Sequence, residues 1–332
     1  MWGAFAPYIN MAGAFPTFEE AEIIQPGGRP IPESLEPRMR LYYIKNKDVR
    51  LRVMHATAVK DEPRGSIIFS PGRTEFIEKY LETVADFTER GFNVLIVDPR
   101  GQGLSDRVLE DKLKSYIDDF QTYADDLAFA ASELDPLLPK PHIVMGHSMG
   151  GTIALQSVIS GSINPSAVIC SAPMLGLFDI DSMIMKWTMQ ICTAMGLGTK
   201  NLPFQKQRSG LPIPFNINKL TSDKDRYRHW AAYFQTTPRL RLGPPTYGWI
   251  VAALKSMAYV NRNASELNIP CLIVAAGADP IVDPKSNETF ARKAGGRYNV
   301  VPGALHELFL ERDVYRDQFF ETFDQFLMEQ GL

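Results

Sequence analysis

The sequence has few of the residues on which several classes of protein depend. Only three of its 332 residues are cysteines, Cys170, Cys192 and Cys271. A small, odd number argues against a disulfide framework and is typical of free thiols in a reducing compartment. The formal net charge is −3 and no basic run is present. Nucleic-acid binding is therefore not expected, because it needs lysine and arginine to replace the counterions of the phosphates.

Long apolar runs are also missing. No stretch reaches the roughly 18 uninterrupted apolar residues of a membrane-spanning helix. Residues 1–18 have neither a basic start nor a long apolar core, so a cleaved signal peptide is not expected. These features predict a cytoplasmic protein, with peripheral contact at the inner membrane face as an open alternative. No spacing indicates a metal site, and the glycines of residues 100–103 lack the Lys-Ser/Thr of a phosphate-binding loop, so no cofactor is expected.

The most informative run that is present is Gly146-His147-Ser148-Met149-Gly150, which fits the pattern G-x-S-x-G. Apolar, strand-like residues 142–145 precede it and a helix-like stretch, 152–160, follows. A turn this sharp between strand and helix needs glycine two residues on either side of the serine. It would hold Ser148 at the carboxyl edge of a sheet and at a helix N-terminus, where backbone N–H groups can stabilise an oxyanion.

A serine nucleophile needs a base, and in hydrolases with such a turn the base follows the serine and the acid in the chain. The five histidines are His55, His142, His147, His229 and His306. Two lie upstream of the turn, His147 adjoins the serine, and His229 stands in a charged, helix-like stretch. His306, in a loop after the strand-like residues 298–301, is therefore the predicted base.

The acid is expected at the end of another buried strand. Residues 270–276 form a continuous apolar run, as in parallel strands that are covered on both faces. Asp279 follows at the carboxyl end, where catalytic groups of open α/β sheets collect. Asp283 is the alternative, although it could instead cap a helix that begins near Pro284.

The second half of an oxyanion hole should come from the loop after an earlier strand. Residues 65–70 are strand-like, and Pro71-Gly72-Arg73-Thr74-Glu75 follow. Glycine at position 72 would let the backbone approach the substrate closely. The predicted donors are the N–H groups of Arg73 and Met149.

Together these motifs resemble the serine α/β-hydrolases of the monoacylglycerol lipase and bacterial lysophospholipase group. The matching runs are residues 71–75 with Lys79-Tyr80, 98–107, 146–150, 277–279 and 304–307. The resemblance is closer to the bacterial lysophospholipases because of residues 220–223 and 242–249. Monoacylglycerol lipases usually carry His-Gly-x-Gly at the oxyanion loop, whereas this chain has Pro71-Gly72-Arg73-Thr74.

The order of elements agrees with that group. Alternating strand and helix patterns predict a mostly parallel, eight-stranded sheet with helices on both faces. Expected elements include an antiparallel pair at 41–44 and 48–58, a strand at 92–98, a helix at 116–134 and a strand at 167–171. Domain boundaries are expected at 1–39 for an extension, 40–173 with 260–332 for the hydrolase core, and 174–259 for a helical cap inserted after the sixth strand.

The expected activity is hydrolysis of a carboxylic ester of a single-chain lipid, either a lysophospholipid or a monoacylglycerol. The cap is rich in methionine, whose flexible thioether suits variable acyl chains. The residues predicted to contact the tail are Met174, Leu177, Phe178, Met183 and Trp187. A cap helix that merely packs on the core would explain them equally well. Arg73, Lys79 and Arg241 could meet a phosphate, although solvated surface would also suit each. A peptidase, an acyltransferase or a non-catalytic binding protein of the same fold stays open.

Overall fold

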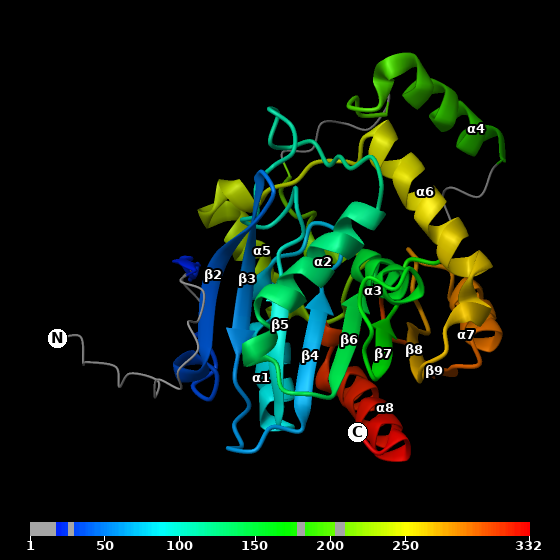
Figure 1. The fold of residues 1–332 in the computed structure, drawn as a ribbon. Helices are drawn as coiled ribbons and strands as arrows, with labels where there is room; N and C mark the ends of the chain where they lie inside the picture. Colours follow the sequence, from blue (N-terminus) through cyan, green and yellow to red (C-terminus); the bar gives the residue numbers. More distant parts are fainter. Residues whose placement is uncertain (1–17, 26–29, 178–182, 203–209) are drawn as a thin grey trace.

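One sheet of nine strands forms the centre of the computed structural model, and helices cover both of its faces (Figure 1). The structure describes residues 18–25, 30–177, 183–202 and 210–332. The strand order is β1-β2-β3-β5-β4-β6-β7-β8-β9. The first three pairs in that order are antiparallel and the remaining five are parallel. The strands are β1 (Glu19–Glu20), β2 (Met39–Asn46), β3 (Val49–Ala56), β4 (Gly65–Ser70), β5 (Phe92–Val97), β6 (His142–His147), β7 (Ala167–Ser171), β8 (Cys271–Ala276) and β9 (Arg297–Val301).

The helices divide the hydrophobic core into two layers, one on each face of the sheet. Helices α1 and α8 pack on one face, and α2, α3 and α7 pack on the other. Every residue of β4, β5 and β8 is buried, as expected of parallel strands covered on both sides. The helices are α1 (Leu81–Glu89), α2 (Gln121–Glu133), α3 (Met149–Ile159), α4 (Met183–Cys192), α5 (Lys224–Thr236), α6 (Tyr247–Arg262), α7 (Pro284–Lys293) and α8 (Asp313–Gln330).

The α/β-hydrolase architecture expected from the sequence is confirmed, with two differences in detail. The eight expected strands are β2 to β9, and the short strand β1 adds a ninth by pairing Glu19 with Tyr43. The helix expected from residue 116 begins at Gln121, whose N–H donates to the Asp119 carboxylate at 2.8 Å. Ser115, just before the expected start, instead forms a bridge to Pro245.

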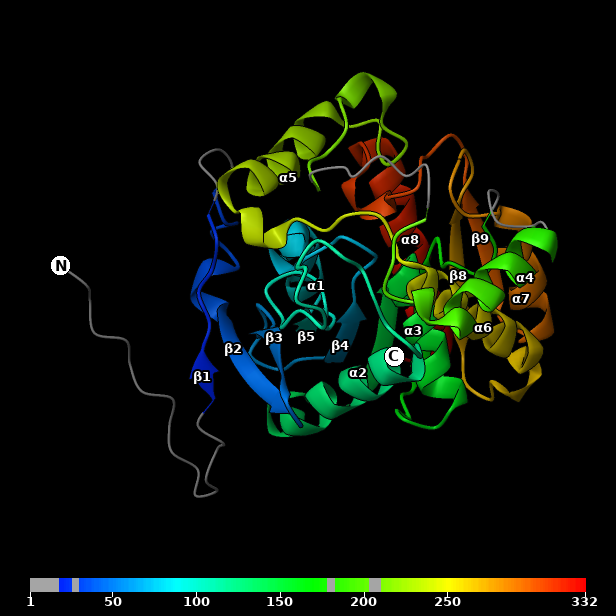
Figure 2. The same cartoon turned by 90° about the horizontal axis from the view of Figure 1, so that it is seen from above.

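The segment between β7 and β8 interrupts the alternation of strand and helix. Among its described residues the regular elements are helical, chiefly α4, α5 and α6. Figure 2 shows α5 on one side of the molecule, with α4 and α6 on the other. Helix α6 packs on both α3 and α4, so it joins the inserted segment to the core. The Gly243 N–H also donates to the Leu113 carbonyl at 2.7 Å, and the Thr246 hydroxyl to the Ser115 carbonyl at 2.8 Å.

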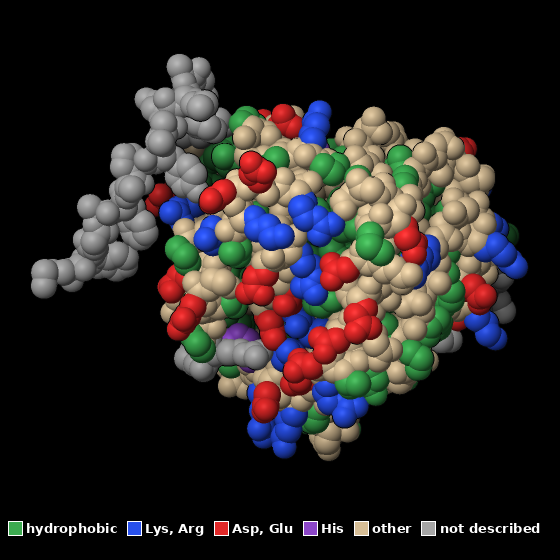
Figure 3. Space-filling view, turned by 90° about the horizontal axis from the view of Figure 1, so that it is seen from below, with side chains coloured by type: hydrophobic (Ala, Val, Ile, Leu, Met, Phe, Trp, Pro, Cys, Tyr) green, Lys and Arg blue, Asp and Glu red, His purple; other side chains and the backbone are tan. Residues whose placement is uncertain are grey.

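The surface seen from below carries acidic and basic side chains interspersed with apolar ones (Figure 3). No helix in the described part of the chain combines the length and the apolar character that crossing a bilayer requires.

Candidate active site

Ser148 lies in the turn between β6 and α3, with φ 53° and ψ −119°. A positive φ costs a residue other than glycine on the order of 1–3 kcal/mol. The surrounding backbone holds this conformation, since the Ser148 N–H donates to the Ser171 carbonyl at 3.0 Å. A Cβ at Gly146 would lie 2.2 Å from the Gly150 carbonyl oxygen, and one at Gly150 would lie 1.9 Å from that of Ser70. Both positions therefore require glycine, and Ser148 stays partly exposed at the carboxyl edge of the sheet.

The loop after β9 brings His306 against Ser148. The His306 Nε2 atom lies 2.9 Å from the Ser148 Oγ atom, which is hydrogen-bonding distance. The histidine is only 4% exposed, so its ring is held by the protein around it. Its position lets a neutral imidazole accept the hydroxyl proton of Ser148.

Asp279, rather than Asp283, faces this histidine. The Asp279 Oδ2 atom lies 2.7 Å from His306 Nδ1, and its Oδ1 atom accepts the N–H groups of Ile281 and Val282. The Asp283 carboxylate instead accepts from the Lys285 N–H and caps α7. Three side chains from three loops at one edge of the sheet thus form a continuous chain of contacts.

The loop after β4 is held close to the serine turn. The Gln102 side chain donates to the Gly72 carbonyl at 2.7 Å and accepts from the Thr74 N–H at 3.4 Å. Among the described residues, none accepts a hydrogen bond from the N–H of Arg73 or of Met149. Met149 is the first residue of α3, where an N–H has no partner within its own helix. Both donors expected for an oxyanion are therefore available.

A buried ionic cluster links this loop to the histidine loop. The Lys79 Nζ atom donates to Glu75 Oε1 at 2.8 Å and to Glu307 Oε1 at 2.6 Å. Glu75 also accepts from the Gly72 N–H and, at 2.5 Å, from the Tyr80 hydroxyl. The interpretation of Lys79 as solvated surface is wrong, since it is 6% exposed. The i,i+4 spacing of Glu75 and Lys79 and the position of Glu307 next to His306 were the signals in the sequence.

The cluster sets the charge of the groups around it. Burial alone would raise the pKa of Glu75, but Lys79 and the hydrogen bonds to this carboxylate lower it to about 2. Burial raises the pKa of Glu307 against the opposing effect of Lys79. Burial also lowers the pKa of His147 to about 4, so this ring, centred 4.9 Å from that of His306, is neutral at pH 7.

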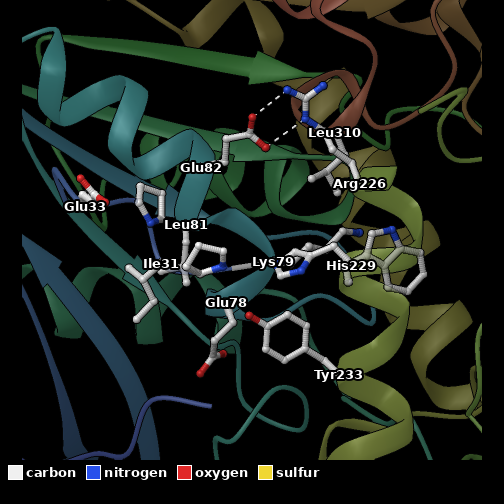
Figure 4. A pocket seen from close by; sticks show the side chains of 13 residues that line it. Ile31, Glu33, Glu78, Lys79, Leu81, Glu82, Arg226, His229, Tyr233 and Leu310 are labelled. Atoms are coloured by element: carbon white, nitrogen blue, oxygen red, sulfur yellow. Dashed lines mark hydrogen bonds and ion pairs between the residues drawn. The ribbon is translucent and has the colours of Figure 1, made fainter. Parts of the chain in front are cut away.

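A cavity of about 700 Å³ adjoins the site. It reaches the oxyanion loop at Arg73 and the acid loop at Ile281. Its other walls come largely from the second half of the inserted segment, which sequence reasoning missed: residues 210–213, Lys219, Leu220, Tyr227, Trp230, Phe234 and 242–245. A second cavity of about 370 Å³ lies between residues 30–33, α1 and α5, where Glu82 and Arg226 are paired (Figure 4).

The residues expected at the acyl tail are distributed differently. Met174 is buried in the core layer beside α3, and Leu177 lines a separate cavity next to α6. Trp187 lies on α4 and is 63% exposed. Phe178 lies outside the described residues, and of Met183 only the backbone, within α4, is described. None of the described side chains among them lines the 700 Å³ cavity.

Comparison with known sequences identifies relatives over most of the chain. Residues 61–313 match the family described as "Serine aminopeptidase, S33". Lysophospholipase L2 of Escherichia coli is 31% identical over 285 residues, which are 81% of this chain and 79% of that protein. A monoacylglycerol lipase of Mycolicibacterium smegmatis is 26% identical over 75% of this chain and 84% of that protein.

Solved structures share the fold. A soluble variant of monoglyceride lipase from Saccharomyces cerevisiae, in complex with a substrate analogue, superposes with a TM-score of 0.72. It is 21% identical, and the superposition covers 91% of this chain and 99% of that one. The match of the family over residues 61–313 and the identity to lysophospholipase L2 show that this chain belongs to the α/β-hydrolases of the serine aminopeptidase S33 family.

Proposed function

We propose that this protein hydrolyses a carboxylic ester of a single-chain lipid, a lysophospholipid or a monoacylglycerol, through an acyl-enzyme at Ser148. The observation that carries the proposal is the chain of contacts from Ser148 to His306 at 2.9 Å and from His306 to Asp279 at 2.7 Å. Ser148 stands on a strained turn, and the loops that carry Arg73 and Ile281 beside it border a cavity large enough for part of a lipid.

In the proposed reaction the Ser148 hydroxyl attacks the ester carbonyl while His306 takes its proton. Asp279 stays ionised and stabilises the imidazolium. The negative charge on the carbonyl oxygen is held by the N–H groups of Arg73 and Met149. His306 then gives its proton to the leaving alcohol, and a water molecule, deprotonated by the same histidine, releases the fatty acid from the serine.

The lipid substrate is supported by the relatives and by the cavity. Two relatives bear the names lysophospholipase L2 and monoacylglycerol lipase. The walls of the 700 Å³ cavity are mostly apolar, with Tyr227, Trp230 and Phe234 along one side. Such walls suit an acyl chain, whose burial is favourable by about 25 cal/mol per Å² of apolar surface.

An aminopeptidase is the second candidate, because the name of the matching family describes that activity. An aminopeptidase must recognise a free ammonium group, for which a carboxylate is the natural partner. The described lining of the 700 Å³ cavity contains Arg73 and Lys219 but neither aspartate nor glutamate. Hydrolysis of a lipid ester is therefore better supported than aminopeptidase activity.

Helix α4 and the short π-helical stretch after it support a proposed contact with a membrane surface. Trp187, Ile191 and Met195 are 63%, 56% and 73% exposed. Side chains of this kind, at helical spacing, can insert into the boundary of a bilayer. The inserted segment, residues 174–259, would then act as the cap through which a lipid reaches the cavity from the inner face of the membrane.

A substrate panel with the Ser148→Ala variant tests the proposal. The panel comprises p-nitrophenyl esters from acetyl to palmitoyl, lysophosphatidylcholine, monoolein and aminoacyl p-nitroanilides. We expect preference for medium or long acyl esters, release of fatty acid from at least one of the two lipids, and loss of activity in Ser148→Ala. Cleavage of the anilides in place of the lipids would favour the peptidase, and hydrolysis of none would favour a binding protein.

A further inference from the structure

The two cavities beside the ionic cluster differ in the sign of their charge. The 370 Å³ cavity is lined by both acids and bases, including Glu82 and Arg226, which bond each other at 2.6 Å (Figure 4). The 700 Å³ cavity has two cations, Arg73 and Lys219, and no carboxylate among its described lining residues. A concave site with one sign of charge and apolar walls concentrates ligands of the opposite charge.

Arg73 is partly buried, and it differs from the buried cations of the described residues in its partners. Arg52, Lys79 and Arg226 each contact two or more carboxylates. Among the described residues, burial lowers the pKa of one other guanidinium, that of Arg107, to about 10. Arg107 donates to four backbone carbonyls and lies near Asp98.

Arg73 has fewer contacts. Its guanidinium donates to the Gly243 carbonyl and, through Nε at 3.4 Å, to the Ser115 hydroxyl. Its Cζ atom lies over the Trp249 ring, 5.4 Å from the ring centre. In the described part of the chain no carboxylate reaches it, and burial lowers its pKa to about 10. Removing a charge from water without a counter-ion is costly, and a bound anion would repay that cost.

We propose that the Arg73 side chain, with Lys219 at the mouth of the cavity, binds the phosphate of a lysophospholipid and so makes the enzyme prefer an anionic lipid over an uncharged monoacylglycerol. The inference rests on the proposed ester hydrolysis. In this proposal Arg73 contacts both ends of the glycerol unit. Its backbone N–H faces the ester carbonyl, and its guanidinium faces the phosphate.

The position of the side chain fits this role. A guanidinium presents five N–H donors in a planar fork, and two of them are occupied by Gly243 and Ser115. The remaining donors can bind two phosphate oxygens at once. Contacts to Trp249, Gly243 and Ser115 fix the fork, which lowers the entropy lost on binding. The acyl chain would extend along the aromatic wall described above, away from the two cations.

The rival explanation is that Arg73 only fastens the inserted segment to the core, since Gly243 belongs to that segment. The two roles differ in their kinetics. A fastening role predicts that Arg73→Met lowers activity toward charged and uncharged substrates alike. A phosphate contact made in both the bound and the transition state predicts a higher KM for the charged substrate alone.

The test measures kcat/KM for 1-oleoyl-lysophosphatidylglycerol and for monooleoylglycerol with the full-length chain and its variants. We expect Arg73→Met to lower the ratio of the two values by about tenfold or more, mostly through KM, because hydrogen bonds to charged groups are among the strongest in proteins. Arg73→Lys should restore part of the ratio, and Lys219→Met should lower it by about twofold, as expected of an exposed charge.

Arg241→Met is the matched control, since Arg241 donates to the Phe234 carbonyl and does not line the cavity. An equal fall in the ratio with Arg73→Met and Arg241→Met would overturn the proposal, as would no change with Arg73→Met.

A competition assay separates this inference from the proposed function. With p-nitrophenyl butyrate as substrate, glycerol 3-phosphate should inhibit the wild type competitively and far more strongly than glycerol, and Arg73→Met should remove the difference. The assay needs only a working triad. Equal, weak inhibition by both compounds in the wild type would refute the phosphate site even if both lipids are cleaved. Failure to cleave any lipid in the panel would instead refute the proposed substrate class.

Discussion

The sheet and the segment inserted between β7 and β8 differ in how firmly their residues are fixed. Every residue of β4, β5 and β8 is buried, and the loops that follow β6, β8 and β9 hold Ser148, Asp279 and His306 in a chain of hydrogen-bonding contacts. The inserted segment is joined to the core by α6 and by α5, whose aromatic side chains pack in a buried cluster with Phe76, Leu104 and Leu310. Its first part, around α4, leaves Trp187 and Met195 largely exposed.

The core and the inserted segment also differ in how their buried or partly buried cations are neutralised. The core neutralises Lys79 with two carboxylates, whereas Arg73, at the boundary with the inserted segment, has no carboxylate partner among the described residues. The comparison suggests that the core carries the chemistry and that the inserted segment and its boundary carry selectivity. Changes in the core should therefore alter turnover or stability by large factors, and changes in the inserted segment should alter preference by small ones.

The largest effect is expected for Asp279→Asn. Asparagine would offer an N–H where the histidine needs an acceptor, so the imidazole would take the wrong tautomer, and kcat should fall by about 10⁴-fold, as in the Ser-His-Asp proteases. Asp283→Asn changes the same group four residues away and serves as the control, with kcat within a few-fold of the wild type because Asp283 only caps α7. Initial rates with p-nitrophenyl butyrate measure both. A larger loss in Asp283→Asn would move the acid to that residue.

The next largest effect concerns stability. Lys79→Met would leave Glu75 and Glu307 buried without their partner, which should lower the free energy of unfolding by about 3–5 kcal/mol. Urea unfolding followed by circular dichroism measures it. The control in the inserted segment is Arg228→Met, whose ion pair with Asp225 is 3.9 Å long and exposed, and which should change stability by less than about 0.5 kcal/mol.

A double variant sharpens this result. Glu75→Gln/Lys79→Met removes both members of a pair, so its cost should be smaller than the sum of the two single costs. Additive costs would show that the two side chains act independently and would contradict the ionic cluster as described.

The third effect in size is a loss of stability in acid. Burial lowers the pKa values of His147 and His55 to about 4 from the ordinary 6.5. Between these two values the unfolded chain binds more protons than the folded one, so the free energy of unfolding should fall as the pH drops from about 6.5 to about 4. Urea midpoints across this range check the sign, and His55→Gln should flatten the curve. Stability that stays constant or rises in this window would contradict the burial of neutral histidines.

The smallest effect is expected in the inserted segment. Replacing Trp187 and Ile191 together by serine should reduce the ratio of vesicle-borne lysophospholipid hydrolysis to p-nitrophenyl butyrate hydrolysis by a few-fold, because less apolar surface would enter the bilayer. Vesicle sedimentation measures binding directly. The control is Val314→Ser on α8, where an apolar side chain is 58% exposed. An equal loss of vesicle binding in this control would contradict a specific membrane-facing surface.

The sequence allowed the core and the three side chains of Ser148, Asp279 and His306 to be predicted, because local rules govern both. Gly146 and Gly150 are required by the turn itself, and a buried run followed by Asp279 marks the carboxyl end of a strand. The eight main strands follow from periodicity for the same reason. The ninth strand, Glu19–Glu20, consists of two residues with no apolar alternation, so no pattern in the sequence predicted it.

The cavity could not be predicted in the same way. Its walls join Arg73 to residues about 140 to 210 positions later in the chain, and only tertiary packing decides which of them face inward. The methionine-rich residues 174–195 drew attention because of their composition, yet the part of the inserted segment that lines the described cavity begins at Gly210. The burial of Lys79 was also hard to predict, since the i,i+4 spacing of Glu75 and Lys79 is the same for a pair in water as for the buried pair seen here.

The central claim is that Ser148 is the nucleophile of an ester hydrolase that accepts a single-chain lipid. Labelling with a fluorophosphonate probe, followed by mass spectrometry of the peptides, tests it most directly. The account predicts one adduct, on Ser148, that Ser148→Ala abolishes and that prior incubation with excess lysophospholipid slows. An adduct on another residue, or no adduct on the folded wild-type protein, would contradict it.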